Sequence, residues 1–237
     1  MSMTLYDLAG ADESVRFSPY CWRVKLALRH KGLEVQTIPW RFTDKERIAF
    51  SGQGLVPVLT DGDKTVVDSW EIARYLDRAY ADRPALFGRR AAEAQALFLK
   101  HWCELTFHPL LLRLILLDIY RHIHEKDKAY FRQSREARFG RPLESIPVPA
   151  EQGIPALREA LAPLRASVQR QPYLGGETPM FVDHMVFAHF QCARAVSSLQ
   201  LLQEDDPVWG WRERMLDAYG GFARSAPVAG PAASAVR

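Results

Sequence analysis

The chain has 237 residues, of which 48% are hydrophobic, and its 31 basic and 28 acidic side chains leave a net charge of +3. This composition is typical of a soluble globular protein of one large or two small domains, and it excludes a collagen, a coiled coil and a chain disordered throughout. The balanced charge argues against a nucleic-acid-binding protein, which usually carries a concentrated basic patch. We therefore expect no nucleic-acid partner.

The three cysteines and the apolar stretches bear on location. Cys21, Cys103 and Cys192 are too few and too scattered for a disulfide framework, and free thiols are typical of a reducing compartment. The first residues show no basic segment followed by an apolar run, so no secretory signal is expected. The most apolar stretch, residues 110–120, is shorter than the roughly 20 residues that a membrane span needs. We predict a cytoplasmic protein that does not enter the membrane.

The first third of the chain alternates between strand-like and helical patterns. Ser18 suits a helix N-cap and Pro19 suits the first helical position, so a helix begins there. Asp61-Gly62 between two apolar runs predicts a hairpin. The predicted elements are strands at 4–8, 35–38, 56–60 and 64–67, helices at 18–30 and 68–80, and an irregular segment at 41–50. This order predicts a four-stranded mixed sheet with helices.

The rest of the chain is helical. The first predicted helix, residues 91–107, meets a stop or kink at His108-Pro109. Further helices are predicted at 110–124, 130–139, 157–168, 183–199 and 211–219. The tail is rich in Ala, Pro and Gly, with little to pack, so it is predicted to be flexible. The predicted boundaries are a mixed α/β domain at 1–82, an all-helical domain at 88–224 and the tail at 225–237.

The sequence Ser-Pro-Tyr-Cys at residues 18–21 lies where a loop meets a helix. A helix start presents unpaired backbone N–H groups and a positive dipole end, which stabilise a carboxylate, phosphate or thiolate. The spacing copies the Cys-x-x-Cys redox motif, but Ser18 replaces the first cysteine, so dithiol chemistry is lost. What remains is a hydroxyl that can donate a hydrogen bond to a sulfur from another molecule. From spacing alone, simple capping by Ser18 is the more common role.

Two further features have similar alternatives. A proline at the beginning of a strand sits at an edge or carries a cis bond, and a cis Val56-Pro57 bond turns the Val56 backbone toward an edge that can pair with an extended peptide. Asp68-Ser69 lies at a second helix start. There the Ser69 N–H and hydroxyl can bind a carboxylate and Asp68 can hold an ammonium group, or the pair only caps the helix.

These three features together resemble the thioredoxin-like half of the glutathione S-transferase family, and the change to helices near residue 85 is similar too. The resemblance spans roughly residues 4–220. It implies an α/β thioredoxin-like N-terminal domain, an all-α C-terminal domain, glutathione as co-substrate and a homodimer. No metal is expected, because His122 and His124 fall on different faces of a helix.

The resemblance also implies roles for individual residues. In this family the Val-Pro bond is cis and the valine backbone pairs with the cysteinyl part of glutathione. The Asp-Ser pair meets the γ-glutamyl end, and the first residue of the Ser-Pro-Tyr-Cys motif meets the sulfur. Ser18 is therefore the predicted catalytic residue, because its hydroxyl and the helix dipole favour the thiolate over a thiol of pKa near 8.5. The predicted glutathione-binding residues are Ser18, Val56, Pro57, Asp68 and Ser69, with Gln53 and Arg41 toward the glycyl carboxylate.

One position departs from the family pattern. The second domain usually carries a Ser/Thr-x-x-Asp capping box before its central helix, but here Met180 precedes Asp183. Loss of an N-cap oxygen costs typically about 1 kcal/mol. We expect this change to affect stability and folding rather than the glutathione site.

A finer similarity points to the bacterial glutathione-dependent β-etherases, which cleave β-aryl ethers. It is carried by residues 4–8, 18–20, 22–23, 29–32 and 68–70, and by 134–136, 174–176 and 204–207 in the second half. Three functions stay open: a transferase whose glutathione thiolate attacks an aromatic electrophile, by conjugation or by cleavage of a β-aryl ether; a generic detoxifying transferase for electrophiles; and a non-catalytic module that binds a ligand or a partner.

The second substrate, a hydrophobic and aromatic electrophile, is expected between the two domains. The candidate residues are Tyr20, Phe42, His101, Trp102, His108 and Tyr120. Aromatic residues at helical spacing are more often part of the core, and a lone histidine on an apolar helix is more often a hydrogen-bonded core residue. His101 and His108 are candidate acids toward a leaving phenolate. The basic stretch 23–31 is expected to be a solvated helix face that helps to capture the anionic peptide.

Overall fold

Apolar residues of the first strands build a small mixed sheet. The computed structural model describes residues 3–88 and 90–230. Strand β1 (Thr4–Leu8) pairs in parallel with β2 (Gln36–Trp40) and antiparallel with β3 (Val58–Asp61), which pairs antiparallel with β4 (Lys64–Val67). The strand order is β2-β1-β3-β4, and Gly62 (φ 58°) turns the hairpin between β3 and β4. The predicted mixed sheet is confirmed.

Two helices accompany this sheet, α1 (Pro19–His30) and α2 (Ser69–Ala79), with a 3₁₀ segment at Lys45–Ser51. Helix α1 packs against α2 on one side and against α8 (Phe181–Val196) of the second domain on the other. The basic stretch 23–31 was expected to be a solvated face. Arg29 is exposed, but the expectation is wrong for Arg23, Lys25 and Lys31, which are at most 5% exposed. Each forms an ion pair instead; the carboxylate partners are Glu104 at 3.2 Å, Asp7 at 2.8 Å and Asp77 at 2.8 Å.

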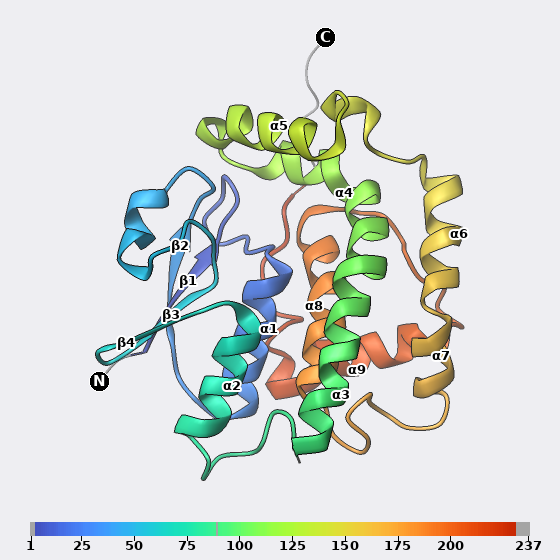
Figure 1. The fold of residues 1–237 in the computed structure, drawn as a ribbon. Coiled ribbons are helices and arrows are strands. Elements are labelled where there is room, and N and C mark those ends of the chain that lie inside the picture. The colour runs from blue at the N-terminus through green and yellow to red at the C-terminus, as the bar shows by residue number, and fades with distance from the viewer. Residues whose placement is uncertain (1–2, 89, 231–237) are drawn as a thin grey trace.

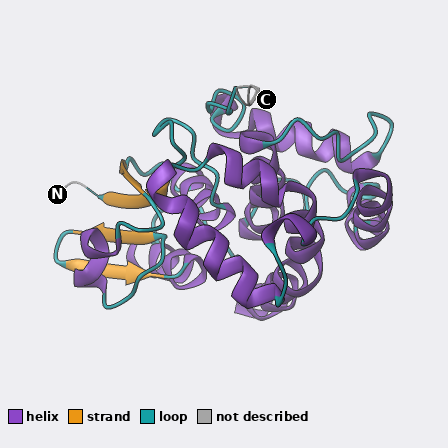
Figure 2. Cartoon of the chain, turned by 90° about the horizontal axis from the view of Figure 1, so that it is seen from above, coloured by secondary structure: helices purple, strands orange, loops and turns teal. Residues whose placement is uncertain are grey.

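The second domain is helical, and Figure 2 shows the strands confined to the opposite side of the molecule. Its other helices are α3 (Arg90–Trp102), α4 (His108–His122), α5 (Glu125–Phe139), α6 (Ala150–Ala160), α7 (Ala162–Val168) and α9 (Pro207–Gly221), with a 3₁₀ turn at Leu143–Ser145. Helix α8 is buried almost throughout and forms the centre of the core, while α5 crosses the end of α4 (Figure 1). The predicted combination of a thioredoxin-like domain and an all-α domain is confirmed.

A π-helical turn, Cys103–Phe107, joins α3 to α4. Pro109 has no N–H to donate to the carbonyl of Leu105, so a regular α-helix would lose a bond there. A π-turn, with hydrogen bonds from residue i to residue i+5, places one extra residue in the helical turn immediately before the proline. The change in helix geometry therefore lies one turn before the predicted position at His108-Pro109.

The start of α8 is held by a buried carboxylate. Asp183 is fully buried, and it accepts hydrogen bonds from the backbone N–H groups of Leu174, Gly175 and Met180 at 2.7, 2.9 and 3.0 Å and from Trp211 Nε1 at 2.9 Å. The Met180 side chain makes no cap bond. Asp183 therefore ties the 174–180 loop and α9 to the helix start.

The end of the described chain runs along α8. The Ala229 N–H donates to the Ala195 carbonyl at 2.8 Å, and residues 231–237 of the predicted flexible tail lie outside the described residues. Across residues 3–88 and 90–230, no helix combines the length and apolar character needed to cross a membrane. Over the same residues, no cluster of three or more His, Cys, Asp or Glu side chains is arranged to hold a metal ion.

Candidate functional site

Ser18 lies at the N-terminus of α1, at the end of the loop that follows β1. Its Oγ accepts a hydrogen bond from the Cys21 N–H at 3.2 Å, which is the N-cap contact expected for serine. An oxygen that accepts from the helix keeps its own proton free to donate elsewhere. The first turn of α1 carries no acidic residue. The position therefore offers one free O–H donor and the positive end of a helix dipole, which both favour an anion.

A cavity of about 440 Å³ opens beside Ser18 between the two domains. Its first wall comes from the thioredoxin-like domain and is formed by Leu8, Phe17, Ser18, Pro19, Tyr20, Trp40, Phe42, Leu55 and Val56. Its second wall comes from the helical domain and is formed by Glu104, His108, Leu111, Leu112, Ile115, Ile119, Phe131, Arg135, Arg138, His189 and Cys192. Most of these side chains are apolar or aromatic, which is typical of a site for a hydrophobic small molecule.

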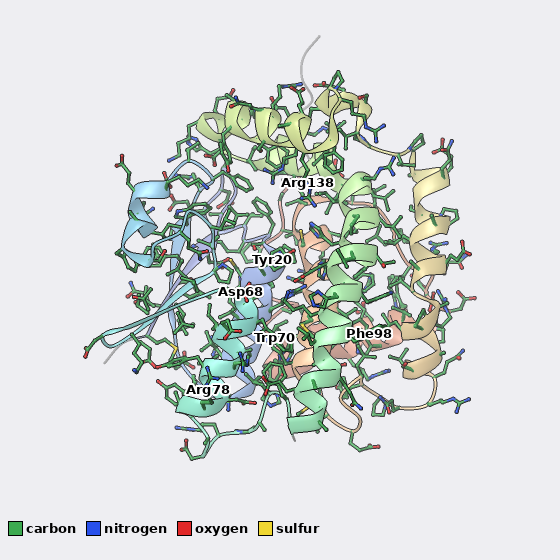
Figure 3. The ribbon with its side chains drawn as sticks, in the orientation of Figure 1. Tyr20, Asp68, Trp70, Arg78, Phe98 and Arg138 are labelled. Carbon is green, nitrogen blue, oxygen red and sulfur yellow. The ribbon has the colours of Figure 1, made fainter. Side chains whose placement is uncertain are left out.

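The cavity brings together several residues that the sequence singled out. Ser18, Tyr20, Phe42, Val56 and His108 all line it. Tyr20 and His108 face one another from opposite domains, with ring centroids 6.2 Å apart. Figure 3 labels Tyr20 at the N-terminal end of α1.

Other predicted acceptor residues lie elsewhere. His101 is exposed on α3, Trp102 stacks on Phe107 with ring centroids 5.7 Å apart, and Tyr120 packs on Phe131 with centroids 6.0 Å apart. None of His101, Trp102 and Tyr120 lines the cavity. The helical domain thus contributes one of the two predicted histidines to this space.

The predicted contacts for the glycyl carboxylate also lie outside the cavity wall. The Arg41 guanidinium donates to the Ala11 carbonyl at 3.3 Å and pairs with Glu13 at 3.1 Å. The Gln53 side chain donates to the Leu55 carbonyl at 3.0 Å. Gln53 therefore lies next to the cavity wall, whereas Arg41 is turned toward the loop that follows β1.

The Val56-Pro57 bond is cis, as the resemblance implies. Pairing of Val58 with Val67 places Asp68 across from Pro57 at the same end of the hairpin. Asp68 has a φ of 69°, and its carboxylate caps α2 by accepting from the Trp70 N–H at 2.9 Å.

Ser69 behaves differently from an ordinary capping residue. It is only 1% exposed, and within the described part of the chain its Oγ has no hydrogen-bond partner. A buried hydroxyl usually has a partner, so this hydroxyl is available to a ligand at the start of α2.

Cys21 lies one turn into α1 and is fully buried, with its Sγ 4.0 Å from the Tyr6 carbonyl oxygen. Burial, followed by the nearby Asp7 carboxylate, raises the pKa of this thiol well above its ordinary value. A thiol that stays protonated at neutral pH is a poor nucleophile. The structure therefore leaves the Ser18 hydroxyl, and not the Cys21 thiol, on the cavity wall.

The helical wall holds charged residues that the sequence did not single out as site residues, Glu104, Arg135 and Arg138. Burial, with a smaller effect of Arg138, lowers the pKa of His108 to about 4. His108 is thus neutral at pH 7, so it can donate one N–H hydrogen bond but has no imidazolium proton to give to a leaving phenolate. Burial also raises the pKa of Tyr20, whose ring lies 4.7 Å from the Arg23 guanidinium carbon.

Comparisons with known proteins agree with this arrangement. A family model described as the glutathione S-transferase N-terminal domain matches residues 14–84, and one described as the C-terminal domain matches residues 94–214. Glutathione S-transferase 4 of Zea mays is 35% identical over 98 residues, 39% of this chain and 43% of the relative. Glutathione S-transferase Z2 of Arabidopsis thaliana is 37% identical over 82 residues, 31% of this chain and 37% of the relative. The chain thus spans about two fifths of the length of these relatives.

Among solved structures, a glutathione transferase of Phanerochaete chrysosporium is similar, with a TM-score of 0.75, 26% identity and 94% of both chains covered. A glutathione S-transferase of Ceriporiopsis subvermispora, solved in complex with glutathione, has a TM-score of 0.80 and 21% identity, with 97% of this chain and all of that chain covered.

Proposed function

Because the chain belongs to the glutathione S-transferase family, we propose that it binds glutathione beside Ser18 and transfers the glutathione sulfur to an electrophile held in the interdomain cavity. The observation that carries this proposal is the position of Ser18, a hydroxyl with a free proton at a helix start on the wall of that cavity. A structural relative is solved in complex with glutathione.

In the proposed reaction the bound glutathione thiol loses its proton to solvent, and the Ser18 O–H donates a hydrogen bond to the resulting thiolate. The thiolate then attacks an electrophilic carbon. A C–S bond forms, and the bond to the leaving group breaks with its electron pair going to that group. His108 is placed to donate a hydrogen bond to substrate, because its neutral ring lines the same cavity.

We propose that the peptide part of glutathione lies along the edge from Val56 to α2. The Val56 backbone precedes β3 at the cavity wall, which supports pairing with the cysteinyl unit. The unpartnered Ser69 hydroxyl and the Asp68 carboxylate support binding of the γ-glutamyl end. Gln53 and Arg41 stay proposed contacts of the glycyl carboxylate, and Lys45 joins them because its ammonium donates to the Gly54 carbonyl beside this wall.

The electrophile is proposed to be aromatic, and its reaction to include cleavage of a β-aryl ether. The support is a set of aromatic side chains in the cavity wall. Phe17, Trp40 and Phe42 come from the thioredoxin-like domain, and Phe131 comes from the helical domain beside the neutral His108. A β-aryl ether with a ketone beside the ether carbon, incubated with glutathione, should release its phenol, which chromatography quantifies. A benzyl halide run in parallel measures plain conjugation, and Ser18→Ala serves as the control for both.

The two reactions are separated by rate. Faster ether cleavage than conjugation supports the etherase assignment, and conjugation alone leaves a general detoxifying transferase. Retention on immobilised glutathione with no turnover of either substrate refutes the enzyme and leaves a binding module.

We further propose a homodimer and a cytoplasmic location. Phe98 on α3 (labelled in Figure 3) and Leu105 in the following turn are each 77% exposed. Such exposure is unusual for large apolar side chains, and it supports the proposal that a second copy of the chain covers this surface. Sedimentation of the wild type and of Phe98→Glu tests this: a dimer that dissociates in the variant supports it, and a monomeric wild type contradicts it. All three cysteines are buried and unpaired, as expected in a reducing compartment.

A further inference from the structure

Two arginines on one turn of α5 face the cavity without a carboxylate partner. Arg135 and Arg138 both line the helical wall, and Figure 3 shows Arg138 on the side of α5 toward Tyr20. Within residues 3–88 and 90–230, neither guanidinium lies within 4.0 Å of an acidic oxygen. Arg135 donates one hydrogen bond, to Ser134 Oγ at 2.8 Å, and its guanidinium lies over the Phe131 ring at 4.1 Å and the Phe42 ring at 5.2 Å.

The other charges on the wall are already matched. Glu104 accepts from Arg23 Nη1 at 3.2 Å and from Lys100 Nζ at 2.8 Å. His108 is neutral at pH 7 because its pKa is lowered to about 4. The uncompensated charge in the cavity is therefore positive, and it comes from the two arginines.

Another arginine of α5, Arg132, is paired with carboxylates, so the lack of such pairing at Arg135 and Arg138 is specific to the cavity wall. Arg132 donates to Glu136 of α5 at 3.1 Å and to Glu144 of the following 3₁₀ turn at 3.0 Å, and it does not line the cavity. Arg135 and Arg138, three and six residues further along, line the cavity, and among the residues that the structure describes neither has a carboxylate partner.

Keeping two like charges in this position is unfavourable without an anion. Burial, with repulsion from Arg138, lowers the pKa of Arg135 to about 10. A carboxylate in the cavity would accept charge-assisted hydrogen bonds from the guanidinium, in place of the hydrogen bonds to water that burial removes. The planar guanidinium matches the two carboxylate oxygens. The aromatic rings around Arg135 accommodate a flat apolar group next to that carboxylate.

We propose that the cavity selects aromatic electrophiles that carry a carboxylate, and that Arg135 and Arg138 bind this carboxylate. The inference rests on the proposed function, because it places the reacting carbon toward Ser18 and the carboxylate toward α5. Arg135 and Arg138 belong to the helical domain, whereas the proposed glutathione contacts belong to the thioredoxin-like domain. The carboxylate is therefore assigned to the electrophile rather than to glutathione.

Titration calorimetry with two conjugates and glutathione alone tests this assignment. S-(4-carboxybenzyl)glutathione should bind the wild type about tenfold more tightly than S-benzylglutathione, as expected for one added charge-assisted contact. Arg135→Gln and Arg138→Gln should each reduce this preference, taken as the ratio of the two conjugates' affinities for the same variant, to about twofold or less, and should leave the affinity for glutathione unchanged. Arg141→Gln is the matched control, because Arg141 is an exposed arginine just beyond the same helix, and it should keep the full preference.

Each other outcome is informative. Equal binding of the two conjugates by the wild type refutes the carboxylate assignment and leaves the proposed function intact. Failure of all three ligands to bind refutes the proposed function and the inference with it. A loss of affinity for glutathione alone in Arg135→Gln or Arg138→Gln assigns the arginines to glutathione and also refutes the inference. Arg138 is exposed at the rim of the cavity, so its variant tests the claim even where the Arg135 variant does not fold.

Discussion

Asp183 offers a quantitative test of how the helical domain is held together. In Asp183→Asn the amide oxygen can replace Oδ1, which accepts from the Leu174 N–H and Trp211 Nε1. The amide NH₂ then replaces Oδ2 and faces two donors, the backbone N–H groups of Gly175 and Met180. Each hydrogen bond to a charged acceptor is worth about 1.5–3 kcal/mol, so losing two should lower the free energy of unfolding by about 3–6 kcal/mol.

Urea denaturation followed by circular dichroism measures this loss. Asp205→Asn is the matched control, because Asp205 is exposed in the loop before α9, and its change should be within about 0.5 kcal/mol. A loss below about 1 kcal/mol in Asp183→Asn would show that the carboxylate does not carry the helix start, and would refute the reasoning. The Met180 side chain makes no cap hydrogen bond, so it cannot compensate for the hydrogen bonds that Asp183→Asn loses at this helix start.

Three further predictions concern pH, the buried thiol and the buried hydroxyl. His184 and His189 are fully buried and burial lowers both pKa values, so below about pH 6.5 the unfolded state binds protons that the folded state does not. The free energy of unfolding should therefore decrease as the pH is lowered, by about 1.4 kcal/mol per pH unit for each histidine. Urea denaturation between pH 6 and 5 should show, for His189→Gln, a dependence of this free energy on pH that is shallower by that amount. An unchanged dependence contradicts the assignment. Cys21→Ser should keep the wild-type kcat/KM for glutathione conjugation, and loss of activity would favour a thiol mechanism. Ser69→Ala should leave stability within about 0.5 kcal/mol and weaken glutathione binding by roughly 2- to 10-fold in calorimetry, the value of one hydrogen bond, whereas unchanged affinity removes Ser69 from the site.

Local signals in the sequence account for the part of the fold that was predicted well. Ser18 and Pro19 begin a helix by capping and by a preset φ, and these preferences depend on neighbours in the chain. The sheet follows from short apolar runs and the turn at Gly62, which are local as well. The glutathione assignment came from resemblance, since spacing alone favoured a simple cap at Ser18.

Contacts between distant segments account for what the sequence did not show. Arg23 and Lys25 were expected in solvent as members of one basic stretch. Two residues apart on a helix, they lie on different faces of α1, and the fold buries both: Arg23 pairs with Glu104 of the π-turn and Lys25 pairs with Asp7 of β1. His101 and His108 are seven residues apart and would share a face of a regular helix. The π-turn between them inserts one extra residue, which rotates the later helix by about 100°, so His108 faces the cavity and His101 faces solvent.

The charged wall of the cavity depends on tertiary structure in the same way. Arg135 and Arg138 stand in a helix with basic residues on several sides, and the chain alone does not show which side meets Ser18. Which side of α5 faces Ser18 is determined by the way α5 crosses the end of α4 (Figure 1).

The central claim is that the Ser18 hydroxyl stabilises the glutathione thiolate, and the pKa of the bound thiol tests it most directly. Ultraviolet absorbance of the thiolate, followed against pH, should give a pKa for bound glutathione below the roughly 8.5 of a free thiol in the wild type. Ser18→Ala and Ser18→Gly both remove the hydroxyl, but glycine retains most of the cap. Both variants should raise this pKa and lower kcat/KM by at least about tenfold, equivalent to about 1.4 kcal/mol. An unchanged pKa and an unchanged kcat/KM in both variants would contradict the account.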